Sequence, residues 1–241
     1  MINYLFSAIS FLTIIPVPKK YRQGIKHILP FFPVVGLFIG GILVLIKFGC
    51  SFVFYKIVVD LLIITVTIII NGGLHLDGLA DSLDGLYAGK NKDEILEVMN
   101  DSHIGTMGVI GIALVILSKF VLLNNIDTAL FNSSLILFPV LGRWAMVLSM
   151  GISKPAKETG LGNYFLSNIS KKDFVISGII TFLITTFVFQ FKGIIIFLFI
   201  SVFSYIFTKY VKKKINGITG DTLGAINEIS EVLVLILLNI K

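Results

Sequence analysis

Charged residues are scarce in this sequence. Only 14% of its 241 residues are Asp, Glu, Lys or Arg, whereas soluble domains average about 25%. The chain therefore has too few charged groups to cover a surface that faces water. Hydrophobic residues make up 56% of it, and its mean hydropathy is +0.95. This composition predicts an integral membrane protein and excludes a soluble enzyme or a disordered adaptor.

Cysteine is almost absent as well, since Cys50 is the one cysteine of the chain. This excludes a disulfide-stabilised scaffold, and no redox role is indicated. No Lys or Arg precedes the N-terminal apolar stretch, and Pro16-Val17-Pro18 ends it where a cleaved signal peptide needs small residues. We expect this stretch to remain in the mature protein.

Long apolar runs fill most of the chain. We expect membrane-spanning helices at 29–47, 52–71, 104–123, 131–150, 174–191, 193–208 and 222–240. A closed barrel would show shorter, alternating strands instead. Residues 2–15 reach only about 21 Å as a helix, which suggests an interfacial or re-entrant helix. The prediction is an all-α, polytopic integral membrane helical bundle with six or seven transmembrane helices, forming a single domain over residues 1–241.

Positive charge lies in short clusters between the apolar runs. The net charge is +6, but dispersed clusters form no single basic surface, so we expect no nucleic acid partner. The positive-inside rule instead places the basic loops in the cytoplasm. These loops contain Lys19, Lys20, Arg22, Lys26, Lys90, Lys92, Lys154, Lys157, Lys171, Lys172, Lys209, Lys212, Lys213 and Lys214. We therefore expect a multi-pass membrane protein with these loops in the cytoplasm.

Acidic residues cluster on this inferred cytoplasmic face. In a helix, Asp81 and Asp84 lie about 40° and −20° around the axis from Asp77, so three carboxylates share one face. Bound Mg²⁺ would offset their repulsion, because it prefers carboxylate oxygens and binds together with substrate phosphates. A solvated acidic helix end is the alternative. We predict Asp77, Asp81 and Asp84 as Mg²⁺ ligands, with Asp101, Asp221 and Glu228 as candidates to complete one or two metal sites.

The expected metal set combines distant parts of the sequence. We therefore expect the 77–84 segment and the start of the last span to be neighbours at the cytoplasmic face.

The segment from Asp101 to Gly108 directly precedes an apolar run. Asp101 or Ser102 is placed to cap the helix that follows. Helix N-termini favour anions, so we predict that Ser102 and the bare backbone at Gly105 and Gly108 bind phosphate. We assign the same role to Thr219, in the Gly-rich start of the last span. Arg143, inside its span, either binds phosphate or forms a buried ion pair with an intramembrane acid.

A proton acceptor is expected near these carboxylates. His75 and His103 are the available imidazoles, although each is equally suited to orienting a carboxylate by hydrogen bonding. We prefer Asp84, because it ends the motif nearest the aqueous entrance.

These motifs resemble the cobalamin synthase family, also called adenosylcobinamide-GDP ribazoletransferase. The resemblance covers nearly the whole chain and is carried by residues 11–18, 32–36, 73–85, 101–106, 160–162 and 219–225, of which Gly73-Leu74-His75-Leu76-Asp77-Gly78-Leu79-Ala80-Asp81-Ser82-Leu83-Asp84-Gly85 is the longest block. It implies Mg²⁺-dependent transfer of the adenosylcobinamide-phosphoryl group from adenosylcobinamide-GDP to α-ribazole or its 5′-phosphate, with release of GMP. The sequence leaves the oligomeric state open, a homo-oligomer included.

Two other readings fit the sequence less well. A CDP-alcohol phosphotransferase also has an aspartate-rich motif at a membrane face, but that family follows its first aspartates with Ala-Arg, whereas Asp81 follows Ala80 here. A cation channel or transporter would use intramembrane acids for travelling ions, but here the acids gather at one face.

Overall fold

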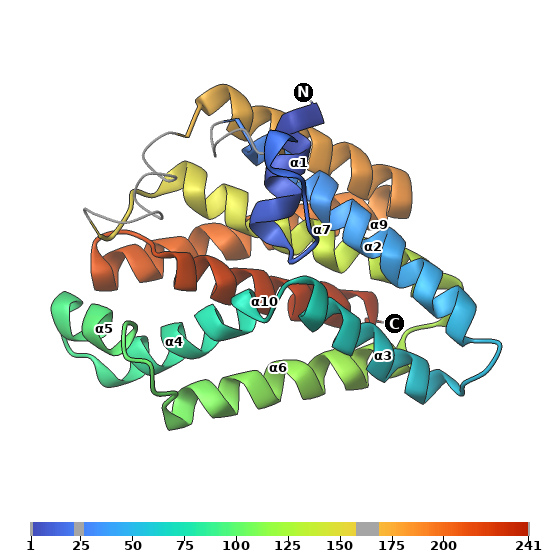
Figure 1. Cartoon of the computed structure of the whole chain (residues 1–241), viewed down its shortest axis with the longest axis horizontal. Coiled ribbons are helices and arrows are strands. Elements are labelled where there is room, and N and C mark those ends of the chain that lie inside the picture. The colour runs from blue at the N-terminus through green and yellow to red at the C-terminus, as the bar shows by residue number, and fades with distance from the viewer. Residues whose placement is uncertain (1, 22–26, 158–168, 241) are drawn as a thin grey trace.

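The computed structural model describes residues 2–21, 27–157 and 169–240, and this part of the chain is helical without a β-strand (Figure 1). The helices in chain order are α1 Ile2–Leu12, α2 Phe32–Cys50, α3 Lys56–Ile70, α4 Leu74–Ala88, α5 Lys92–Val98, α6 Thr106–Asn125, α7 Thr128–Ile152, α9 Lys171–Ile215 and α10 Gly220–Leu238. The predicted all-α class is confirmed. Arg22, Lys26 and the Gly160-Leu161-Gly162 motif lie outside the described residues.

Helix α7 forms the centre of the bundle. It packs against α2, α9 and α10, and all of its residues from Leu137 to Met150 are buried. Helix α10 packs against α7 on one side and against α4 and α6 on the other, so α4, α10 and α6 lie side by side (Figure 1). The two acidic segments of the sequence, one on α4 and one on α10, are therefore in direct contact.

Four described helices are long and apolar enough to cross a membrane, or five if α3 and α4 form one span bent by 83°. The chain is a multi-pass membrane protein, and this number takes α9 as one helix although its backbone is interrupted at Gln190. Two of the expected spans, 174–191 and 193–208, are the two parts of α9. The last one, 222–240, corresponds to α10, whose three carboxylates make it too polar to qualify.

Helix α9 folds back on itself at Gln190, which has a non-helical backbone (φ 49°, ψ −131°). Its residues Phe174 and Phe197 would lie about 35 Å apart in a straight helix. Both rings nevertheless stack on Trp144, with ring centroids 5.9 Å and 5.4 Å from it. The two parts of α9 therefore form a helical hairpin against α7.

Helix α1 is too short to cross a bilayer. Its 11 residues span about 17 Å, roughly half of a hydrocarbon core. The chain then leaves the helix, and the Ile14 N–H donates to the Ile70 carbonyl at the end of α3 (2.8 Å). This agrees with the short N-terminal helix expected from residues 2–15.

Candidate active site

A glycine turn sets the direction of α4. Gly72 and Gly73 have φ values of 62° and 71°, in the left-handed region that residues with a Cβ rarely adopt. This turn joins α3 to α4 at a bend of 83°. It carries the predicted metal ligands of α4 alongside α10.

Helices α4 and α10 touch at their backbones. A Cβ atom on Gly78 would lie 2.8 Å from the Cα of Asp221, and one on Gly224 would lie 3.0 Å from the carbonyl oxygen of His75. Small residues are what allow two helices to approach this closely. The expectation that the 77–84 segment neighbours the start of the last span is confirmed.

This contact brings together three carboxylates, Asp77, Asp81 and Asp221, which we call the acidic centre. The negative charges of Asp77, Asp221 and Asp84 repel that of the half-buried Asp81, whereas the Lys157 ammonium attracts it. Likewise, Asp77 repels the carboxylate of Asp221 and Lys157 attracts it. The centre is open to solvent, since Asp77 is exposed.

The donor chemistry of the acidic centre suits a hard divalent cation, because it offers only carboxylate oxygens and their mutual repulsion needs a counter-charge. In the described part of the chain, however, no three His, Cys, Asp or Glu side chains converge closely enough to hold a metal ion. The Mg²⁺ site stays a prediction.

Asp84 caps helix α6 across the bundle. Its Oδ2 accepts from the Gly105 N–H (2.7 Å) and its Oδ1 from the Gly108 N–H (2.9 Å). A carboxylate at a helix N-terminus satisfies free N–H groups and interacts favourably with the helix dipole.

This arrangement corrects two sequence-based predictions. The helix is capped by Asp84 rather than by Asp101 or Ser102, and the Gly105 and Gly108 N–H groups hold that carboxylate rather than a phosphate. The geometry favours Asp84 as a positioning residue that ties α4 to α6, over its predicted roles as base and metal ligand.

The contacts that the structure describes for the Asp101 carboxylate are local. Its Oδ1 accepts from the backbone N–H of His103 (3.0 Å) and lies 2.7 Å from Nδ1 of the same residue. These hydrogen bonds hold the pKa of Asp101 below its usual value. Asp101, Ser102 and His103 are all exposed, and none of these contacts joins Asp101 to the acidic centre.

Thr219 begins helix α10 through a capping box. Its Oγ1 accepts from the Thr222 N–H (3.2 Å), while its own N–H donates to Thr222 Oγ1 (2.9 Å). Thr219 is buried, and its side chain also hydrogen-bonds Asp221. The predicted phosphate-binding residue is therefore engaged in fixing Asp221.

A buried network of charges lies deeper, between α3, α6, α7 and α10. Lys119 Nζ donates to Glu228 Oε2 and Glu231 Oε2, each at 2.6 Å. Arg143 donates to Glu231 and to Asn71 Oδ1 (2.7 Å). Two positive charges thus balance two negative ones inside the bundle. The predictions of Arg143 as a phosphate ligand and Glu228 as a metal ligand give way to ion pairing.

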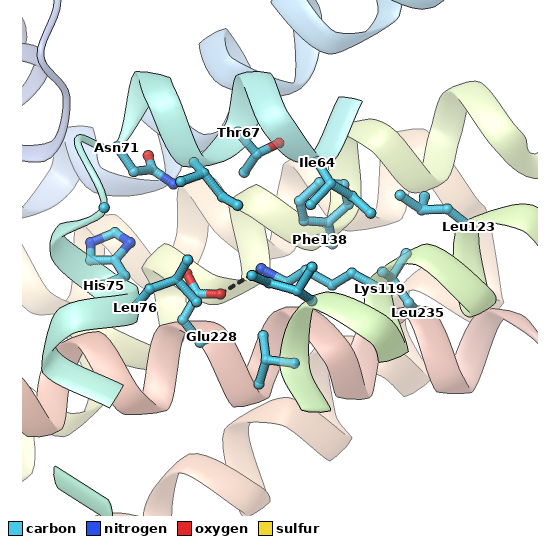
Figure 2. Close-up of a pocket in the computed structure, with 14 residues that line it drawn as sticks. Ile64, Thr67, Asn71, His75, Leu76, Lys119, Leu123, Phe138, Glu228 and Leu235 are labelled. Carbon is cyan, nitrogen blue, oxygen red and sulfur yellow. Dashed lines mark hydrogen bonds and ion pairs between the residues drawn. The ribbon is translucent and has the colours of Figure 1, made fainter. Parts of the chain in front are cut away.

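His75 lies beside this network and away from solvent (Figure 2). It lines a cavity of about 20 Å³ together with Asn71, Lys119 and Glu228, which is room for about one water molecule. Neither ring nitrogen has a hydrogen-bond partner within the described residues. Its burial places His75 inside the bundle rather than in the solvent-accessible acidic centre, so the geometry does not favour it as the base.

Nearly the whole chain is similar to one family of known proteins. Residues 4–239 match the family model described as cobalamin-5-phosphate synthase. The chain belongs to this family. The family predicted from the motifs is confirmed.

Relatives named adenosylcobinamide-GDP ribazoletransferase match the chain over almost their full length. The protein of Thermoanaerobacter pseudethanolicus is 36% identical over 98% of this chain and 96% of its own. Those of Caldanaerobacter subterraneus and Acetivibrio thermocellus are each 37% identical, over 98% and 95% of this chain and 97% and 94% of their own. No solved structure matches the chain significantly.

Sequence reasoning missed Lys119 and Lys157. Lys119 stands alone in the middle of an apolar run, and such an intramembrane charge signals a buried partner. Lys157 was assigned to a cytoplasmic loop, and its proximity to the acidic centre depends on the packing of that loop.

The capping of α6 by Asp84 yields a first prediction. In Gly108→Ala the added Cβ collides with the Asp84 carboxylate, so the cap is lost and the free energy of unfolding should fall by about 1–2 kcal/mol. Denaturant titration in detergent micelles measures this change. Gly41→Ala is the control, because a Cβ there meets nothing within 4 Å. Equal stability of the two variants would contradict the cap.

The buried network yields a second prediction. Lys119→Met leaves two glutamates facing one arginine, which should lower the free energy of unfolding by about 3–5 kcal/mol. The double variant Lys119→Met/Glu228→Gln removes one charge of each sign and should recover part of that loss. Lys214→Met, at an exposed lysine, serves as the control in the same titration. A single variant as stable as this control would refute the ion pairing.

Proposed function

We propose that this protein transfers the adenosylcobinamide-phosphoryl group of adenosylcobinamide-GDP to α-ribazole or α-ribazole 5′-phosphate. The observation that carries the proposal is the match to relatives of that name over nearly the whole chain. The meeting of Asp77, Asp81 and Asp221 supports it, because carboxylates can hold a divalent cation against substrate phosphates.

In this reaction an acceptor hydroxyl attacks the phosphorus that bears the cobinamide group. A new P–O bond forms to the acceptor, the bond from that phosphorus to the GMP oxygen breaks with its electron pair staying on GMP, and the hydroxyl proton passes to solvent. Positioning and electrostatic stabilisation supply most of the acceleration in such transfers. The acidic centre alone would repel the phosphates, so the proposal includes a cation.

We propose Mg²⁺ as that cation, bound by carboxylates of Asp77, Asp81 and Asp221 together with the substrate phosphates, which would complete a ligand set that the described side chains alone do not form. When bound, it would offset negative charge on the phosphate oxygens. Asp84 keeps α4 against α6, and Thr219 fixes Asp221 at the start of α10. Lys157 provides positive charge at the border of the centre.

We further propose that the acidic centre faces the cytoplasm at the plasma membrane of a prokaryote. Lys154 and Lys157 lie close to it, and Lys212, Lys213 and Lys214 end α9 just before α10 begins. By the positive-inside rule such a cluster lies on the cytoplasmic side.

Turnover by the purified protein tests the function. In nanodiscs with adenosylcobinamide-GDP and α-ribazole, GMP should be released, and chelation of Mg²⁺ should abolish the release. Asp81→Asn should lower kcat at least about 100-fold, because it removes charge from the metal-binding set. Asp93→Asn, at an exposed carboxylate of α5, should leave it within twofold. Chelation-resistant turnover would refute the metal, and absence of GMP release by the native chain would refute the function.

A further inference from the structure

A polar depression borders the acidic centre, and we call it the basic pocket. Its described lining is Lys92, Lys154, Pro155, Ala156, Lys157, Lys212 and Asn216. Its volume is about 580 Å³, within the range of roughly 300–1,000 Å³ that small-molecule sites occupy. Four of the seven lining residues are lysines and none is a carboxylate, so the pocket selects for an anion.

Among the residues that the structure describes, the lysines of the basic pocket form no ion pair with a carboxylate. Lys92, Lys157 and Lys212 are half-buried, yet no ion pair within the described residues includes them. Lys157 donates to the neutral amide of Asn100 (2.6 Å). By contrast, the buried Lys119 is held between two glutamates. Four cations around one depression repel one another, and a bound anion would relieve that repulsion.

Backbone hydrogen bonds fix the basic pocket next to the acidic centre. The Ala156 N–H donates to the Ile218 carbonyl and the Ile218 N–H to the Lys154 carbonyl, both at 2.9 Å. Ile218 precedes Asp221 by three residues. The charge of Lys157 also acts on Asp81 and Asp221. A ligand that spans both sites would therefore meet carboxylates at one end and ammonium groups at the other.

We propose that the basic pocket binds a phosphate ester anion, namely the guanosine phosphate end of the donor. This inference rests on the proposed function, in which GMP is the leaving group. The lysines would hold the leaving phosphate while the phosphorus under attack lies at the acidic centre. Lysine suits this role because its ammonium is a compact point charge with three donors.

An anionic lipid headgroup carries the same phosphate chemistry and would also be found at a membrane face. The nucleotide is the occupant we choose, because the pocket adjoins the acidic centre. The experiment must therefore separate a soluble nucleotide from a lipid.

Binding of GMP to the full chain in nanodiscs of purely zwitterionic lipid makes this distinction. Lys212→Gln and Lys154→Gln should each raise the Kd for GMP about tenfold, since each removes a charge-assisted contact. Lys213→Gln is the matched control, because Lys213 adjoins Lys212 at the end of α9 but is exposed and outside the lining. It should stay within twofold of the native chain. Lys212→Arg keeps the charge and should retain most of the affinity, which separates binding from folding.

Three results would overturn the proposal. One is an unchanged Kd in both Lys212→Gln and Lys154→Gln. Another is an equal rise in Lys213→Gln, which would indicate a general surface charge effect. The third is a loss of anionic-lipid enrichment around Lys212→Gln in mixed-lipid nanodiscs with unchanged GMP affinity, which would assign the pocket to a headgroup.

The two proposals fail separately. If the native chain releases GMP from the donor while both pocket variants keep the native KM for it, the basic pocket is wrong and the function stands. If the native chain releases no GMP but the variants still weaken GMP binding, the function is wrong and the pocket is a phosphate site.

Discussion

The close approach of α4 to α10 is the constraint on which the candidate site depends. Both helices carry carboxylates that repel one another, and bringing them together is unfavourable unless other forces hold the helices in place. Gly78 and Gly224 permit contact of the two backbones, and the Asp84 carboxylate anchors α4 to the start of α6. The packing of three helices thus fixes carboxylates that electrostatics alone would separate.

A second constraint is charge balance in the apolar interior. Lys119 and Arg143 lie on α6 and α7, whereas Glu228 and Glu231 lie on α10, so each helix alone would carry uncompensated charge into the bundle. In an apolar surrounding such a charge is costly, and the pairing makes correct assembly a condition for burial. The network holds α10 at Glu228 and Glu231, in the middle of the helix, while the acidic centre occupies its N-terminal end.

The N-terminal end of α10 lies between opposite charges. The acidic centre is on the α4 side. The basic pocket is lined by the 154–156 segment, which hydrogen-bonds Ile218 just before α10. In the function proposed above, a donor with two phosphate groups and a nucleoside would use both surfaces, with a cation near the phosphorus under attack and positive charge around the leaving group. Their arrangement around one short segment provides a physical basis for phosphoryl transfer at this face.

The sequence by itself determined the membrane class, the helical elements and the family, because these follow from composition, apolar run length and the aspartate motif. It also placed Asp77, Asp81 and Asp221 together. Only the tertiary structure decided the partners of Asp84, Arg143 and Glu228. A carboxylate or a guanidinium can bind a metal or phosphate ligand as readily as it can form an ion pair or a helix cap. The tertiary structure also brought four lysines together around one pocket. Those features depend on residues from different helices meeting in space, which periodicity along one helix does not record.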